Sequence, residues 1–108
     1  MPHRAMLAAL ALLLAAGSAF AASGDAWEEF ARTVEEKCLA AAADMIEAPR
    51  ALVDPFGSER FGLAIVTGKA KGADAAISHI CVMDKQSETV ELGSELSGDH
   101  LRVTPAER

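Results

Sequence analysis

The sequence predicts an α+β domain of two layers, in which one long N-terminal helix packs on a three- or four-stranded antiparallel meander. Three observations lead to this prediction. Apolar residues recur with helical spacing over Asp25–Glu47. Short apolar runs separated by turn residues follow, which is typical of strands joined by hairpins. Cys38 lies in the helical stretch and Cys81 in a strand-like run, so a disulfide would join the two layers.

The helix is predicted from a single apolar stripe along one of its faces. Its members lie three or four positions apart: Trp27, Ala31, Val34, Cys38, Ala41 and Met45. Asp25 and Glu28 fit a capping box, in which each side chain accepts a hydrogen bond from a free backbone N–H at the helix start. Pro49 disfavours helical backbone at Ala48, so we expect the helix to end near Glu47.

The first 21 residues have the pattern of a secretory signal peptide. Arg4 supplies positive charge, Ala5–Ala16 is an apolar run, and Ala19 and Ala21 are small residues at the positions that a signal peptidase reads. We expect cleavage after Ala21, with Ala22 as the alternative. The run is too short to cross the roughly 30 Å hydrocarbon layer as a helix. The sequence therefore predicts a periplasmic or secreted protein with no stable membrane insertion after cleavage.

Residues 22–108 are predicted to form one small domain with a single small core. They hold nine Lys and Arg against sixteen Asp and Glu, a net charge of −7, because Arg4 is the one charged residue outside them. This charge argues against binding nucleic acid or anionic membranes. It suits a basic protein partner, although an acidic surface that only aids solubility is the simpler interpretation.

The segment that follows the helix, Arg50–Arg60, is predicted to be a loop. Asp54–Ser58 contains the Asp, Pro, Gly and Ser residues that favour tight turns. A short helical turn is expected at Ala51–Val53 before this loop.

Three strands are predicted next, at Phe61–Thr67, Ala75–Asp84 and Glu88–Leu92. A flexible basic loop, Gly68–Gly72, separates the first two, and a hairpin turn at Asp84–Ser87 separates the last two. The order of these elements favours an antiparallel meander.

The C-terminal segment, Gly93–Arg108, has a weaker pattern. Leu96, Leu101 and Val103 leave open a short fourth strand at the edge of the sheet, although glycine and proline interrupt the segment. Residues 104–108 are expected to be frayed.

The two cysteines are predicted to form a disulfide, since both lie in the exported part. Such a bond would contribute about 4 kcal/mol by the chain-entropy estimate. Their separation is unlike the CxxC motif of thioredoxin-type proteins. The alternative is a metal-binding or redox site, because His79 and Cys81 are two positions apart on a strand and share a face, with Cys38 opposite. This set lacks the paired-ligand spacing of zinc modules, so the disulfide is favoured.

No catalytic constellation is visible in residues 22–108. His79 and His100 are their only histidines, and no serine lies in a nucleophile-elbow motif. The sequence therefore predicts a protein that is not an enzyme, has no cofactor, and binds another protein or acts as an inhibitor. The candidate binding surfaces are the outer face of the sheet and the loops at residues 54–60 and 68–73.

Overall fold

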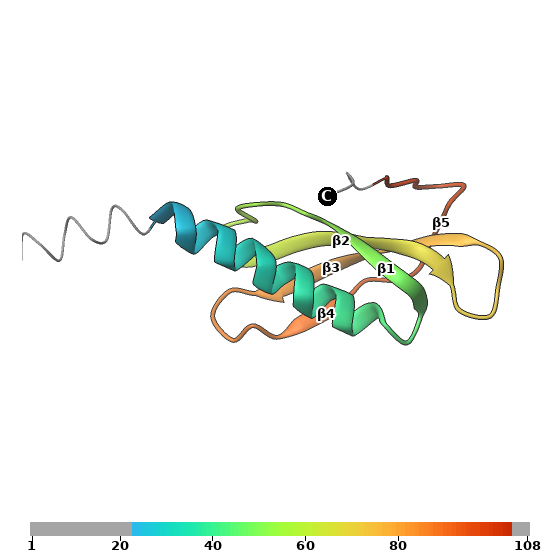
Figure 1. The fold of residues 1–108 in the computed structure, drawn as a ribbon, viewed down its shortest axis with the longest axis horizontal. Coiled ribbons are helices and arrows are strands. Elements are labelled where there is room, and N and C mark those ends of the chain that lie inside the picture. Colours follow the sequence, from blue (N-terminus) through green and yellow to red (C-terminus); the bar gives the residue numbers. More distant parts are fainter. Residues whose placement is uncertain (1–22, 105–108) are drawn as a thin grey trace, which may run out of the picture.

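The computed structural model describes residues 23–104 and confirms the predicted α+β fold class (Figure 1). One helix, residues 23–42, packs on an antiparallel sheet with the strand order β1-β2-β3-β4, and β5 also pairs with β3. The strands are β1 (Ile46–Val53), β2 (Phe61–Ala70), β3 (Ala76–Asp84), β4 (Val90–Leu92) and β5 (Leu96–Ser97). The predicted signal peptide, its cleavage site and the last four residues lie outside the described part.

The core lies between the helix and one face of the sheet. Of the predicted stripe, Ala41 is exposed, as are Trp27 and Met45 at its ends. The fully buried helix residues are Val34, Cys38 and Ala42, which lie on one side of the helix. Strand residues at alternate positions meet them, which puts one face of each strand toward the helix. These buried strand residues are Ile46, Ala64, Val66, Ile77, Cys81 and Met83. Burial of each large aliphatic side chain contributes on the order of 2 kcal/mol.

Two glycines in β2 lie against closely packed side chains. A β-carbon built on Gly62 would lie 2.6 Å from Val34 Cγ2 of the helix, and one built on Gly68 would lie 2.5 Å from Ile46 Cγ2 of the neighbouring strand β1. Both distances are far below van der Waals contact. A larger residue at Gly62 would therefore push the helix away from the sheet, and one at Gly68 would displace Ile46. Glycine at position 62 thus sets the spacing between the two layers.

The prediction that the helix continues to Glu47 is wrong, because it ends at residue 42. Ala43 N donates to Ala40 O (3.3 Å) and Met45 N to Ala42 O (3.0 Å), so the last turn is a tight one. The chain then turns and enters β1 at Ile46. Met45 continues the helical spacing of apolar residues. Ile46, however, is buried in the sheet, and this burial favours the start of a strand over a further helical turn.

The predicted helical turn at Ala51–Val53 is also wrong, because these residues belong to β1. For the same reason, the predicted loop at Arg50–Arg60 is wrong over residues 50–53. β1 pairs with β2, with Leu52 opposite Ile65, and a bulge lies between Glu47 and Arg50. The bulge contains Pro49, which an edge strand tolerates because its missing N–H is not needed for pairing. Residues 54–60 do form the connection between β1 and β2, as the turn residues in this segment predict.

Smaller differences concern the ends of the predicted strands. Gly68, Lys69 and Ala70 belong to β2 rather than to a flexible loop: Lys69 pairs with both neighbouring strands, Gly68 with β3 and Ala70 with β1. β4 starts at Val90 because Glu88 has a positive φ of 60° and belongs to the preceding turn. The possible edge strand exists only as β5, which contains Leu96 and pairs with Ile77 and Ser78 of β3, whereas Leu101 and Val103 lie outside any strand.

Candidate functional site

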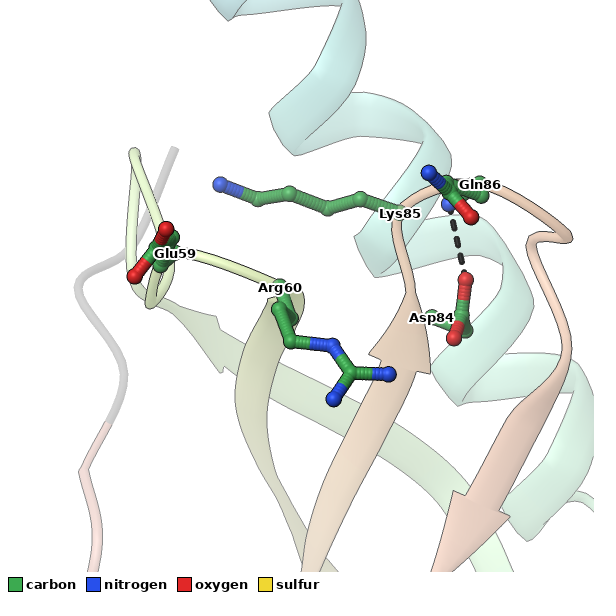
Figure 2. A pocket seen from close by; sticks show the side chains of 5 residues that line it. All are labelled: Glu59, Arg60, Asp84, Lys85 and Gln86. Atoms are coloured by element: carbon green, nitrogen blue, oxygen red, sulfur yellow. Dashed lines mark hydrogen bonds between the residues drawn. The ribbon is translucent and has the colours of Figure 1, made fainter.

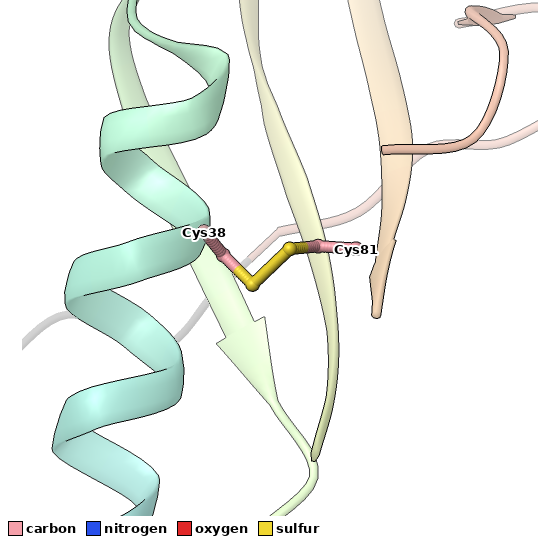
Figure 3. The surroundings of a disulfide bond; sticks show 2 residues. All are labelled: Cys38 and Cys81. Atoms are coloured by element: carbon pink, nitrogen blue, oxygen red, sulfur yellow. A yellow bond between two sulfur atoms is a disulfide. The ribbon is translucent and has the colours of Figure 1, made fainter. Parts of the chain in front are cut away.

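The predicted disulfide between Cys38 and Cys81 is confirmed, and it crosses from the C-terminal part of the helix to β3 (Figure 3). Both residues are fully buried. Their α-carbons are 5.9 Å apart, which lies within the ordinary range for a disulfide. The bond therefore links the two layers at the centre of the core.

His79 lies on the same face of β3 as Cys81 but has its own hydrogen bond. The side chain is 5% exposed, and its Nδ1 lies 2.8 Å from the carbonyl oxygen of Gly93. A carbonyl oxygen only accepts, so Nδ1 carries the proton and donates. The other ring nitrogen, Nε2, has no hydrogen-bond partner within residues 23–104. His79 thus ties β3 to the segment that follows β4.

The alternative site of His79 with Cys38 and Cys81 has both sulfur atoms bonded to one another. A metal ion needs thiolates as ligands, and these would be available only after reduction of the disulfide. Within the described range, no group of three His, Cys, Asp or Glu side chains is placed to hold a metal ion. His100, the other histidine of residues 22–108, is exposed, and its Nδ1 lies 3.2 Å from the Ser97 hydroxyl.

Two loops at one end of the sheet are each organised by an aspartate. Asp54 Oδ1 accepts from the backbone N–H groups of Phe56 (3.1 Å) and Gly57 (3.0 Å). Asp84 Oδ1 accepts in the same way from Ser87 (3.0 Å) and Gln86 (2.8 Å). These hydrogen bonds to the ionised carboxylates hold the pKa of both groups below the usual value. Both carboxylates are therefore charged at neutral pH.

Lys85 joins these two loops. Its Nζ donates to the carbonyl oxygens of Phe56 (2.9 Å) and Ser58 (2.7 Å), and Figure 2 shows the side chain extending from the β3–β4 turn toward the loop with Glu59. A polar groove of about 240 Å³ lies here, lined by Glu59, Arg60, Asp84, Lys85 and Gln86. Lys85 and Asp84 already form hydrogen bonds with the backbone of the two loops. These two side chains therefore stabilise the loops, which leaves them fewer hydrogen bonds to offer a ligand in the groove.

An aromatic cluster lies beside the same loops, at the start of the helix. Trp27 meets Phe30 and Phe56 edge to face, with ring centroids 5.6 and 5.3 Å apart. Lys85 Nζ lies 5.3 Å from the centre of the Trp27 ring, within cation–π range. An apolar groove of about 340 Å³ borders this cluster, lined by Gly24, Trp27, Glu28, Ala31, Pro55 and Phe56.

The face of the sheet that points away from the helix carries a row of aliphatic side chains. Strand register places Leu52, Ile65 and Ile80 side by side on β1, β2 and β3. Leu52 and Ile80 are each 49% exposed. They border a shallow groove of about 360 Å³, lined by Leu52, Val53, Asp54, Leu63, Ala64, Ile65 and Ile80. Exposed aliphatic side chains that lie together in this way mark a candidate surface for binding a partner.

The predicted binding surfaces differ in how the structure places them. The outer face is exposed at Leu52 and Ile80, and the loop at residues 54–60 lies next to this part, with Asp54 at the boundary. Residues 68–73 are instead divided between β2 and a tight turn. The contribution of Leu52 to the outer face was missed, since β1 was read as a loop. The contact between Trp27 and Phe56 joins distant parts of the sequence, and no local pattern around either residue predicts it.

No helix within residues 23–104 has the length and apolar character needed to cross a membrane. No protein-family model, curated protein or solved structure matches this chain.

Proposed function

We propose that this protein is a small exported, non-catalytic domain that binds another protein or inhibits it, and that the outer face of its sheet is the binding surface. One observation carries the proposal: the fold leaves the row of Leu52, Ile65 and Ile80 uncovered, although the other face of the same sheet is fully packed. An open aliphatic row of this kind costs solubility, and a protein partner would bury it.

Export is supported by the pattern of the first 21 residues and by the disulfide. Structural disulfides form in oxidising compartments such as the periplasm or the extracellular space. Intact mass and N-terminal sequencing of the natural protein test this part. We expect a mature chain that starts at Ala22 or Ser23 and contains no free thiol. A full-length chain with two free thiols would contradict export and would favour the metal-binding or redox alternative.

Binding is tested with a photo-cross-linking amino acid placed at Ile80 in the full chain, in the host that makes it. The control carries the same group at Glu36, an exposed residue of the helix. We expect a defined adduct with one protein from position 80 and none from position 36. The partner is then identified by mass spectrometry and its binding is measured with both purified proteins.

The proposal fails if position 80 gives no adduct, or if the purified partner binds the Ile80→Thr variant as well as the natural protein. In the second case the cross-link would report proximity and not recognition. Threonine suits the test because it keeps the β-branched shape that strands favour while it removes most of the aliphatic surface.

A further inference from the structure

The outer face is divided into a covered part and an open part. Ser78 points away from the helix, since it pairs with Thr67 one row along from Ile80, yet it is only 1% exposed. Figure 1 shows the chain after β5 turning back and running along the sheet on the side away from the helix. This tail, residues 98–104, follows β5, whose Leu96 pairs with Ser78, whereas Ile80 is 49% exposed.

Exposure alternates along the tail. Leu101 and Val103 are half-buried, whereas Arg102 and Thr104 between and beyond them are exposed. Leu101 N donates to Ser97 O (3.0 Å), but no backbone hydrogen bond joins residues 102–104 to other parts of the described chain. The half-burial of Leu101 and Val103 therefore does not come from pairing as a strand.

The open part has the same aliphatic floor and adds one charge. Leu52, Leu63, Ile65 and Ile80 line the groove, and Asp54 lies at its end. The Asp54 carboxylate is ionised at neutral pH, and residues 22–108 carry a net charge of −7. A basic group on an incoming segment would be attracted to this end and an acidic one would be repelled.

We propose that the open groove binds an extended segment of another protein, with aliphatic side chains at alternate positions and a basic residue that meets Asp54. The tail of this chain provides the pattern, because it runs along the same side of the sheet with alternate aliphatic residues half-buried. This inference rests on the proposed function, since it names the chemistry of the partner that the outer face binds.

A short synthetic peptide tests the inference with purified components. The probe has Leu, Val and Leu at alternate positions, Thr between them and Lys at one end. Two matched peptides replace Lys by Glu, or keep the composition but place the aliphatic residues consecutively. The ¹⁵N-labelled chain of residues 22–108 is titrated, and amide shifts are followed. We expect saturable shifts at Leu63, Ile65 and Ile80, with weaker binding of both matched peptides.

Two variants separate the contributions of the aliphatic row and the charge. Ile80→Thr should weaken binding of the Lys peptide about tenfold, the loss expected when one aliphatic contact is removed. Met45→Thr, at an exposed apolar residue in the turn before β1, should leave binding unchanged. Asp54→Asn keeps the oxygen that bonds to the loop, and it should reduce the preference for Lys over Glu.

Several results would overturn the inference. They are the absence of saturable shifts at millimolar peptide, equal binding of the consecutive-aliphatic peptide, and shifts that map to Trp27 and Phe56. Shifts at Ile80 that depend on protein concentration without peptide would assign the face to a second copy and would also overturn it. None of these results decides whether a partner is captured by cross-linking, so failure of the inference and failure of the proposed function remain distinguishable.

Discussion

Ile80 and Cys81 are consecutive residues of β3 that lie on opposite faces of the sheet. Cys81 is fully buried against the helix and bonded to Cys38, whereas Ile80 is half-exposed on the outer face. This alternation follows from the two-residue period of a strand. The disulfide thus fixes the strand that presents Ile80 at one side of the proposed binding surface. Changes on the two faces should accordingly have separate effects, on stability from the inner face and on binding from the outer one.

Gly62→Ala should destabilise the domain because the helix lies directly over this residue. The added β-carbon would approach Val34 Cγ2 to 2.6 Å and Phe30 Cζ to 3.2 Å, so the helix must shift. We expect a loss of about 1–3 kcal/mol, the usual cost of overpacking a core. Urea unfolding followed by circular dichroism measures it.

Gly24→Ala is the matched control, because nothing lies within 4 Å of a β-carbon at this helical residue. It should be neutral or stabilising by up to about 1 kcal/mol, since alanine favours helix. Equal effects of the two substitutions would contradict the close contact between Gly62 and the helix.

Removal of the disulfide should cost a large share of the stability. The bond joins residues with a sequence separation of 43, for which restriction of the unfolded chain gives about 4 kcal/mol. Small domains have only about 5–15 kcal/mol in total. The double variant Cys38→Ala with Cys81→Ala should therefore unfold at much lower urea concentration, and the reduced natural protein should behave like it. A loss below about 1 kcal/mol would argue that the chain-entropy estimate does not apply to this domain.

The sequence was sufficient to predict the layers, the central strands and the disulfide, but not β1. The two central strands have apolar residues at regular intervals, and each carries core residues that the helix must cover. In β1, the bulge between Glu47 and Arg50 adds one residue. Ile46 and Ala51 pair with the inward-facing Ala70 and Val66 although they are five positions apart, so no simple alternation marks the strand.

The candidate site could be predicted only in part for a related reason. A two-layer fold implies an outer face, and Ile80 follows from the alternation in β3. Leu52 belongs to the strand that the bulge conceals, so the width of the aliphatic row was not visible. The contacts of Lys85 with Trp27 and with the carbonyl oxygens of the β1–β2 loop depend on tertiary approach, which no local pattern encodes.

Lys85→Met should loosen the loop at residues 54–60 and alter the environment of Trp27. The substitution keeps most of the apolar stem but removes two hydrogen bonds to carbonyl oxygens and the charge above the aromatic rings. We expect a loss of about 1–2 kcal/mol. Trp27 is the only tryptophan, so its fluorescence and its quenching by acrylamide report directly on the cluster.

The control for Lys85 is Lys71→Met, in the exposed β2–β3 turn. It also removes one positive charge, but Lys71 follows the end of β2, whereas the loop that contacts Trp27 precedes the start of this strand. Stability and quenching should stay close to those of the natural protein. If both variants raised quenching equally, the effect would come from net charge and not from the contacts of Lys85.

Asp84→Asn should separate the effect of charge from that of the hydrogen-bonding oxygen in the β3–β4 turn. Bonds from Ser87 N and Gln86 N lower the pKa of Asp84 below its usual value of 3.8. An ionised carboxylate with a lowered pKa in the folded state stabilises the fold above the unfolded pKa, and that contribution is lost as pH falls through the folded pKa. The natural protein should therefore be more stable than Asp84→Asn at pH 7, and the difference should shrink as the pH falls to about 2. Urea midpoints across this range measure it. Asp84→Ala, which lacks the accepting oxygen, should be less stable than Asp84→Asn at every pH. A difference between the natural protein and Asp84→Asn that did not change with pH would mean that the turn depends on the shape of the side chain and not on its charge.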